Sequence, residues 1–300
     1  MTRRELLLAG LAALAPRPAG RTRLVLLGTG GGPSPKRLRS APAQVLVAGG
    51  RAYVVDCGDG VARQLVRAGV RAPQLRAVFL THHHSDHNAD YGNLLLFAWI
   101  DGLREPVDTY GPPPLARITR LLFETHAYDI ATRMADEGRA PLEPLVRPHE
   151  LTAAGEVMRD EHVRVTAALN AHPPVSPSFA YRFDAADRSI VISGDTAFSP
   201  AVVALARGAD VLVHEAIYPP AVDRLAAERP HAARLREHLL ASHTSPEDAG
   251  RVAAAAGVTT LVLSHLVPGD DARITDAMWA EGARRHFGGR IVVGRDLMEI

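Results

Sequence analysis

The chain has 300 residues, of which 47% are hydrophobic and 22% are charged, and its formal net charge is +1. A chain of this length and composition can bury a substantial core, as one large domain or as two small ones. The near-zero charge excludes a broad basic surface for nucleic acid, and the single cysteine, Cys57, excludes an intramolecular disulfide and a zinc site built from cysteines.

The first 20 residues are typical of a targeting segment. Arg3 and Arg4 precede an apolar run at 6–15, which is too short to span a bilayer but suits the apolar region of a signal peptide. The paired arginines resemble a twin-arginine export signal, which predicts a periplasmic or secreted protein. The alternative is a frayed N-terminal helix of a cytoplasmic protein. No later stretch is long and apolar enough for a transmembrane helix. Because 21–300 contains no internal repeat and no linker of low complexity, it is predicted to form a single domain.

From residue 23 onward, segments with the patterns of strands and helices alternate. Short apolar or β-branched runs bounded by glycine predict strands at 24–27, 45–47, 53–55, 77–80, 163–168, 179–183, 190–193, 211–213 and 261–263. Apolar residues three or four positions apart predict helices at 61–68, 89–100, 115–134, 200–207, 246–256 and 274–286. Two strand-rich halves with helices outside predict an α/β fold, a four-layer αββα sandwich with the functional site where the halves meet.

The glycine-rich stretch 28–32 follows the first predicted strand and invites comparison with a nucleotide-binding loop. Pro33 and Pro35 stand where the dinucleotide-binding motif requires a helix to begin, so the helix N-terminus that would bind phosphate is missing. We therefore expect an ordinary turn at 28–32.

A cluster of candidate metal ligands follows the predicted strand 77–80. Alternate residues of an extended segment share a face, so His82 and His84 can meet one metal ion, while Asp86 and His87 can address a second one where the chain turns. Imidazole and carboxylate ligands suit zinc, and also manganese, iron or cobalt. The alternative is a histidine-rich surface loop, but four ligands spaced H-x-H-x-D-H directly after an apolar strand favour a metal site.

This motif resembles that of the metallo-β-lactamase superfamily, and the likeness extends from residue 23 to the C-terminus. The stretch 56–60 is similar to the acidic turn that precedes the histidine motif in that family. Three later positions match the remaining ligands of the family in chain order: His172, Asp195 and His265. The resemblance implies two divalent cations, with zinc as the first candidate and manganese or iron as alternatives. It implies that the first is held by His82, His84, His172 and Asp195. It implies that the second is held by Asp86, His87, Asp195 and His265.

Two further motifs resemble the ribonuclease Z and arylsulfatase-like side of that superfamily. They are centred on Glu215 and His243, and the resemblance implies that Glu215 holds His243 beside the metals as a proton donor. Asp86 is counted among the catalytic groups as well as among the ligands. The alternative for His243 is a structural place beside the start of the helix 246–256, where Ser245 is a suitable N-cap.

The resemblance implies a hydrolase in which two cations activate a water that attacks an ester. Ribonuclease Z enzymes carry a long arm between the third histidine ligand and the bridging aspartate. Here only 23 positions (195 − 172) separate His172 from Asp195. Together with the near-neutral charge and the predicted export, this spacing favours a small-molecule ester of the aryl sulfate or phosphodiester type and disfavours nucleic acid. Aromatic residues in 97–137 are candidates for a lid or wall of the substrate pocket, and ordinary helical packing is an equally good interpretation of each of them.

Two other functions stay open. A ribonuclease Z-like endonuclease or phosphodiesterase acting on RNA predicts an arginine-lined groove and a steep dependence of binding on salt. A non-catalytic metal protein is disfavoured because such a protein would not need the Glu215 and His243 motifs. A homodimer is compatible with the sequence.

Overall fold

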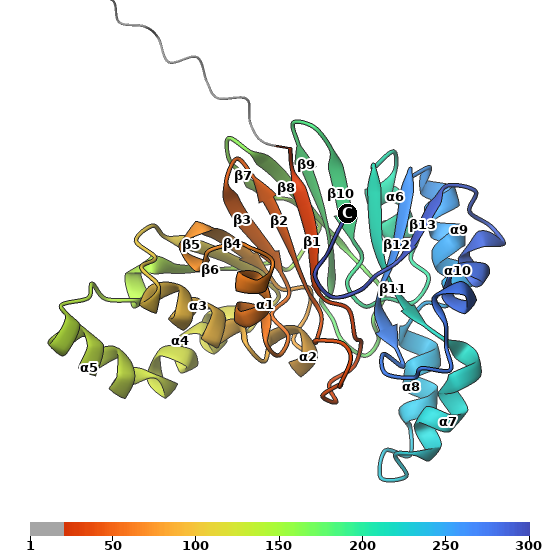
Figure 1. The fold of residues 1–300 in the computed structure, drawn as a ribbon, viewed down its shortest axis with the longest axis horizontal. Helices are drawn as coiled ribbons and strands as arrows, with labels where there is room; N and C mark the ends of the chain where they lie inside the picture. The colour runs from red at the N-terminus through yellow and green to blue at the C-terminus, as the bar shows by residue number, and fades with distance from the viewer. Residues whose placement is uncertain (1–20) are drawn as a thin grey trace, which may run out of the picture.

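A computed structural model describes residues 21–300, which form two facing sheets of seven strands with helices on both outer faces (Figure 1). This arrangement confirms the predicted four-layer αββα sandwich. The predicted export signal falls on residues 1–20, which lie outside the described residues. Within 21–300, no helix has both the length and the apolar character needed to cross a membrane.

The first sheet is built mainly from the N-terminal half of the chain, in the order β14-β1-β2-β3-β4-β5-β6. Its strands are β1 (Arg23–Gly28), β2 (Ala43–Ala48), β3 (Arg51–Val55), β4 (Leu75–Phe79), β5 (Val107–Gly111), β6 (Val146–Glu150) and β14 (Met298–Glu299). The antiparallel pair β2 and β3 forms a hairpin, whereas β3, β4, β5 and β6 run parallel. The sequence did not predict β5, β6 or β14.

The second sheet comes from the C-terminal half, in the order β13-β12-β11-β10-β9-β8-β7. Its strands are β7 (Gly155–Arg159), β8 (Val163–Leu169), β9 (Phe179–Ala185), β10 (Ser189–Ile192), β11 (Val211–Ile217), β12 (Thr260–Val267) and β13 (Arg290–Val293). Strands β10, β11, β12 and β13 are parallel. Because the carboxyl ends of parallel strands meet at one edge of a sheet, the segments at the ends of β10, β11 and β12 lie at the same edge of the second sheet.

Helices cover the outer faces of both sheets (Figure 1). On the first sheet they are α1 (Val61–Arg67), α3 (Tyr91–Ile100), α4 (Leu115–Thr125) and α5 (Ala127–Glu137). On the second sheet they are α6 (Pro200–Ala206), α9 (Pro246–Ala256) and α10 (Asp276–Arg284). Two short helices, α7 (Val222–Ala227) and α8 (Leu235–Ser242), project past one end of the second sheet. The single helix predicted at 115–134 is interrupted at His126, which separates α4 from α5.

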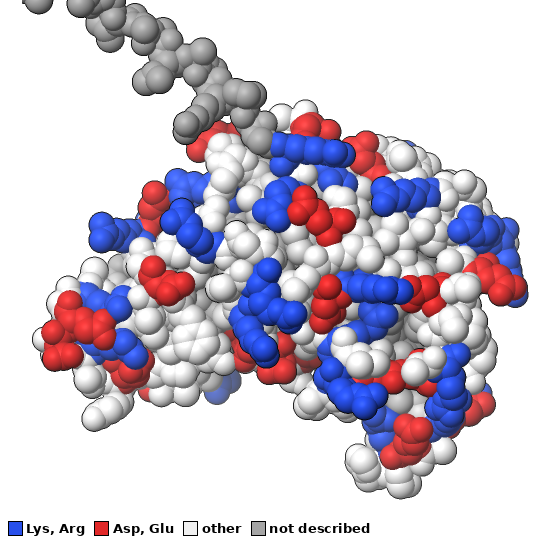
Figure 2. All heavy atoms as spheres, viewed as in Figure 1, with Lys and Arg blue, Asp and Glu red and all other residues white. Residues whose placement is uncertain are grey.

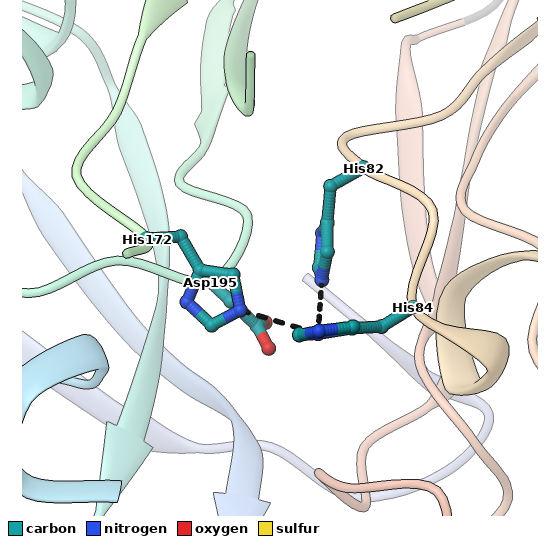
Figure 3. Close-up of side chains that lie close together, drawn as sticks. All are labelled: His82, His84, His172 and Asp195. Carbon is teal, nitrogen blue, oxygen red and sulfur yellow. Dashed lines mark hydrogen bonds between the residues drawn. The ribbon is translucent and has the colours of Figure 1, made fainter. Parts of the chain in front are cut away.

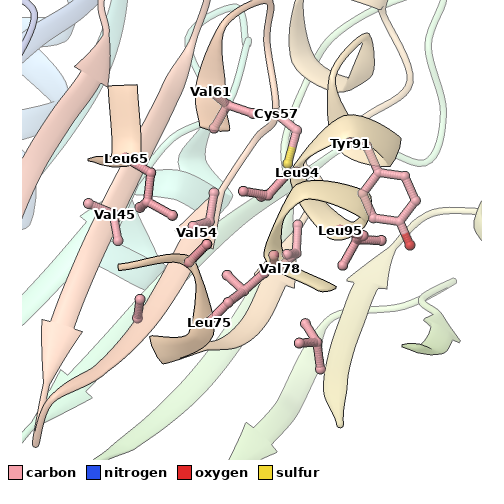
Figure 4. Packing of buried hydrophobic residues seen from close by; sticks show 14 of the residues in the cluster. Val45, Val54, Cys57, Val61, Leu65, Leu75, Val78, Tyr91, Leu94 and Leu95 are labelled. Carbon is pink, nitrogen blue, oxygen red and sulfur yellow. The ribbon is translucent and has the colours of Figure 1, made fainter. Parts of the chain in front are cut away.

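The core has three apolar layers because the central strands are buried on both faces. In β1, Leu24 and Leu26 pack between the two sheets, whereas Val25 and Leu27 pack beneath the helices of the first sheet. Most strands buried on both faces are continuous apolar runs, which is why their positions could be predicted from the sequence, whereas the buried strand β5 carries Asp108 and Thr109 and was missed. Figure 4 shows the layer beneath α1 and α3, where Cys57 is fully buried and where burial raises the pKa of its thiol.

Candidate metal centre

The loop after β4 carries the first candidate ligands toward the second sheet. His82 and His84 follow the strand directly, and α2 (Ser85–Asn88) then turns the chain. Figure 3 shows their side chains meeting those of His172 and Asp195, which come from the opposite sheet. His84 Nδ1 lies 3.0 Å from His82 Nε2 and 3.2 Å from His172 Nε2. One ligand atom from each of the four residues falls within 4.8 Å of the others.

A second group of ligand atoms lies beside the first. Asp86 Oδ2 is 3.6 Å from His87 Nε2 and 3.4 Å from His265 Nε2. Asp195 touches this group through both carboxylate oxygens, since Oδ1 is 3.3 Å from His87 Nε2 and Oδ2 is 3.1 Å from His265 Nε2. The structure thus brings together all seven predicted ligand residues, with Asp195 in contact with both groups.

The residues of these two groups fit divalent cations. His87 Nε2, Asp195 Oδ1 and His265 Nε2 are buried side-chain atoms that have no hydrogen-bond partner among the described residues. Buried polar atoms in native proteins are nearly always satisfied, so atoms of this kind that converge on one point indicate a missing partner. Imidazole nitrogens and carboxylate oxygens without a thiolate are the ligands of many zinc sites and also suit manganese or iron.

Hydrogen bonds behind the ligands fix their orientation. Asp56 is buried and accepts hydrogen bonds from the Thr81 amide and from His87 Nδ1, each at 2.8 Å. His172 Nδ1 donates to the Ser242 carbonyl at 3.0 Å. Both imidazoles are thereby held in the tautomer that leaves Nε2 free to bind a cation.

A β-bulge positions the last ligand. The pairing of β11 with β12 shifts so that His265 is the extra residue, and its φ of 47° lies in the left-handed region. The neighbouring turn 28–32 packs against it, and a Cβ on Gly31 would stand 2.4 Å from His265 Nδ1. The next amide in that turn, Gly32 N, donates to Asp86 Oδ2 at 2.9 Å. The glycine-rich stretch is therefore a turn that supports the metal centre.

Glu215 and His243 form the predicted pair at the edge of the centre. His243 Nδ1 lies 2.9 Å from Glu215 Oε1, which also accepts a hydrogen bond from the Thr196 amide. Burial lowers the pKa of His243, but the Glu215 carboxylate outweighs it, so the pKa is raised. His243 also has a ring nitrogen within 4.8 Å of ligand atoms of Asp195 and His265. Ser245 is the N-cap of α9, as expected if His243 only had a structural place beside this helix. The structure contains both this cap and the contact between His243 and Glu215.

The two ligand groups differ in their electrostatics. Burial lowers the pKa values of His82, His84 and His172, which keeps these imidazoles in the neutral form that binds metals. In the second group, burial lowers the pKa of His265, but Asp195 outweighs it and raises the pKa to about 10. Without cations, the second group is thus held by ion pairs, and cations that bind there would displace protons.

A cavity of about 750 Å³ opens onto the metal centre. Its walls are the turn at 31–36, the segment 267–273 and the α7–α8 hairpin, which we define as residues 222–242. The prediction that 97–137 forms a wall is wrong, because Tyr110 stacks on Phe79 between the sheets and Tyr128 is 86% exposed.

The charged rim and one histidine of this cavity were not predicted from the sequence. Four cationic side chains line it beside acidic ones, and two of the four, Arg224 and Arg273, pair with Asp271. The other two are Lys36 and Arg229. His238 also lines the cavity, from α8, where the sequence pattern alone favours an ordinary surface histidine. The sequence shows only that His238 lies five positions before His243. Its place in the cavity follows from the packing of α8 beside the metal centre.

Comparison with known proteins agrees with this geometry. The family model for the beta-lactamase superfamily domain matches residues 51–266. The chain is 38% identical over 279 residues to a ribonuclease Z of Mycobacterium sp. (strain KMS), covering 92% of this chain and 95% of the relative. It is 35% identical over 280 residues to a ribonuclease Z of Mycobacterium bovis (strain BCG / Pasteur 1173P2), covering 92% and 97%.

Solved structures show the same fold. The metallo-beta-lactamase fold protein YhfI from Bacillus subtilis superposes with a TM-score of 0.69 at 22% identity, covering 93% of this chain and 98% of that one. The short form of human tRNase Z gives a TM-score of 0.67 at 23% identity, with the same coverage. The curated relatives support the ribonuclease Z side of the resemblance and give no support to the arylsulfatase-like side.

Proposed function

Because the chain belongs to the metallo-β-lactamase superfamily and is a metal-dependent hydrolase of ester bonds, we propose that its substrate is RNA and that it cleaves phosphodiester bonds as a ribonuclease Z-like enzyme. The observation that carries this proposal is the pair of ligand groups joined through Asp195 at the floor of the cavity. The first site would take His82, His84, His172 and Asp195. The second would take Asp86, His87, Asp195 and His265.

Divalent cations held there, zinc first among the candidates, would lower the pKa of water and neutralise charge on phosphoryl oxygens. The residues of the chain supply the remaining steps. Glu215 holds His243 Nδ1, which directs the other ring nitrogen of His243 toward Asp195 and His265, where the scissile bond would lie. We assign to His243 the donation of a proton to the leaving oxygen, and to Glu215 the orientation of the ring.

We favour RNA over a small ester as the substrate for two reasons, the similarity to curated ribonuclease Z proteins and the cationic side chains at the rim of the cavity. The aligned 279 residues cover 92% of this chain and 95% of the mycobacterial ribonuclease Z, so that relative has no room for a long arm that this chain lacks. The short segment between His172 and Asp195 therefore does not separate this chain from proteins of that name. The rim residues Lys36 and Arg229 supply cations for the groove that the RNA hypothesis predicts, whereas Arg224 pairs with Asp271.

The test is a substrate panel run on metal-loaded protein. A precursor transfer RNA with a 3′ extension should be cleaved, and chelator should abolish the cleavage. Bis(p-nitrophenyl) phosphate, p-nitrophenyl sulfate and a β-lactam are the comparison substrates. Hydrolysis of the aryl sulfate without any cleavage of RNA would overturn the proposal in favour of a small ester. The His243→Ala variant should lose at least about a hundredfold in kcat, the usual contribution of a general acid, while metal content stays unchanged.

A further inference from the structure

His238 is a cavity residue that the proposed catalytic steps leave unused. It lies on α8 and lines the same cavity as His84, Asp195 and His243. Its ring centroid is 6.2 Å from that of His84 and 5.8 Å from that of His243. It therefore stands beside both the first ligand group and the assigned proton donor.

Hydrogen bonding fixes which nitrogen of His238 carries the proton. Ser242 Oγ donates its single hydrogen to the Pro173 carbonyl at 2.5 Å, and His238 Nδ1 lies 3.3 Å from the same Oγ. A serine hydroxyl that has already donated can only accept, so the hydrogen between these two atoms belongs to Nδ1. Cations bound in the centre would oppose a second proton on the ring.

The neutral ring then presents Nε2 as a hydrogen-bond acceptor. No residue in 21–300 hydrogen-bonds Nε2, and the half-buried ring faces the cavity. Phosphate oxygens accept hydrogen bonds and do not donate them, so they do not fit an acceptor nitrogen. The sugar next to a scissile phosphate in RNA carries a 2′-hydroxyl, which can donate, and the corresponding sugar in DNA lacks it.

We propose that His238 is a specificity-determining residue that accepts a hydrogen bond from the ribose 2′-hydroxyl beside the scissile phosphate, so that the site prefers RNA to DNA. This inference rests on the proposed function, since it names the feature of the RNA that the same site reads. It also accounts for the position of α8, which carries both His238 and Ser242, the residue that orients the His238 ring.

The experiment compares a precursor transfer RNA with a 3′ extension in two forms. One is all-ribose, and the other has a single 2′-deoxynucleotide on the 5′ side of the cleaved bond. Wild-type protein should cleave the all-ribose form about five- to tenfold faster in kcat/KM, the effect expected for one neutral hydrogen bond. In His238→Ala, the rate on the all-ribose form should fall to that on the deoxy form, and the preference should disappear.

Controls separate recognition from structure. In His238→Ala the bound metal should equal that of wild type, and the loss of rate on bis(p-nitrophenyl) phosphate, which has no hydroxyl, should be smaller than the loss on the all-ribose RNA. Leu240→Ala changes an exposed residue of α8 outside the cavity and should keep the full ribose preference. His238→Gln retains an acceptor oxygen and should recover part of the preference.

An equal loss of rate on all three substrates, or a loss of metal in His238→Ala, would show that His238 only supports the centre and would overturn the inference. An unchanged ribose preference in that variant would also overturn it. If wild-type protein hydrolyses bis(p-nitrophenyl) phosphate but neither RNA, the proposed function fails and this inference fails with it. Cleavage of both RNA forms at equal rates by wild type overturns this inference alone.

Discussion

At the scale of single residues, three histidines of the metal centre are oriented by a hydrogen bond to Nδ1, which leaves Nε2 to face the centre. His87 Nδ1 meets Asp56, His172 Nδ1 meets the Ser242 carbonyl, and His243 Nδ1 meets Glu215. In every case Nε2 is the atom left for a cation or a substrate. The chain therefore selects the binding tautomers before any cation arrives, which reduces the reorganisation that binding requires.

The Asp56→Asn variant tests this arrangement. The amide keeps the shape of the carboxylate but removes its charge and one acceptor, so His87 Nδ1 loses the partner that makes its Nε2 basic. We expect metal affinity to fall about 10- to 100-fold, measured by competition with a chromogenic chelator. The matched control is Asp59→Asn, an exposed carboxylate in the same turn, which should bind metal as wild type does. Equal affinities for Asp56→Asn and wild type would contradict the assignment.

Gly31→Ala tests the contact between the glycine-rich turn and the last ligand. The added Cβ would stand 2.4 Å from His265 Nδ1 and 2.6 Å from Val267 Cγ2, so the imidazole must move. We expect one of the two bound metals to be lost, measured by elemental analysis, and activity to fall at least about tenfold because misplaced groups lose much of their effect. Gly288→Ala adds a Cβ that meets nothing within 4 Å and should change neither quantity.

Residues that act locally were predictable from the sequence, and residues that act through tertiary contacts were not. The cluster from His82 to His87 lies within one short segment, so strand geometry and spacing identified it. His172, Asp195 and His265 are scattered along the chain, and only the resemblance to a family identified them. His238 was missed because its role depends on how α8 packs over the centre.

At the scale of elements, most central strands could be predicted because burial on both faces requires an apolar run, whereas short helices at the surface could not. Helices α7 and α8 bury few side chains, chiefly Val222 and Leu239, so they carry little apolar periodicity. A wall of the cavity was considered for 97–137 because that segment carries several aromatic side chains. Its apolar side chains instead serve the packing of α3 and α4 on the first sheet.

The N-terminus of α9 offers a test at this scale. Ser245 accepts a hydrogen bond from the Asp248 amide, and Thr275 caps α10 in the same way from the Met278 amide. Replacing either cap by alanine should lower the free energy of unfolding by about 1 kcal/mol, measured by urea denaturation. Only Ser245→Ala should also reduce kcat, because that cap lies two residues after His243. Equal activity in the two variants would show that the cap does not position the imidazole.

At the scale of the whole molecule, the centre joins the two sheets. The loop after β4 of the first sheet supplies four of the ligand residues, and the second sheet supplies His172, Asp195 and His265. Cations bound at both sites would therefore link the halves. The surface viewed in Figure 2 has basic and acidic side chains interspersed, so the attraction of RNA is assigned to the cavity rim rather than to a broad field.

Removal of the metals should therefore destabilise the whole fold. Cations that bind the folded state and not the unfolded one raise the melting temperature, so we expect chelator to lower it by roughly 5–10 °C and added zinc to restore it. Differential scanning fluorimetry measures both changes. In His82→Ala the shift should be smaller, since one ligand group is incomplete. Superimposable melting curves with and without chelator would contradict the proposed coupling.

The last two strands belong to different sheets. After β13 completes the second sheet, the chain crosses back, and Met298 and Glu299 pair with Leu26 and Val25 of β1. The first sheet is thus completed by a strand from the C-terminal end of the chain, whereas the second sheet takes no strand from the N-terminal half. A gene fragment that begins near residue 150 would encode all seven strands of the second sheet, whereas the preceding fragment would lack β14, so reassembly of the two would have to return this C-terminal strand to β1.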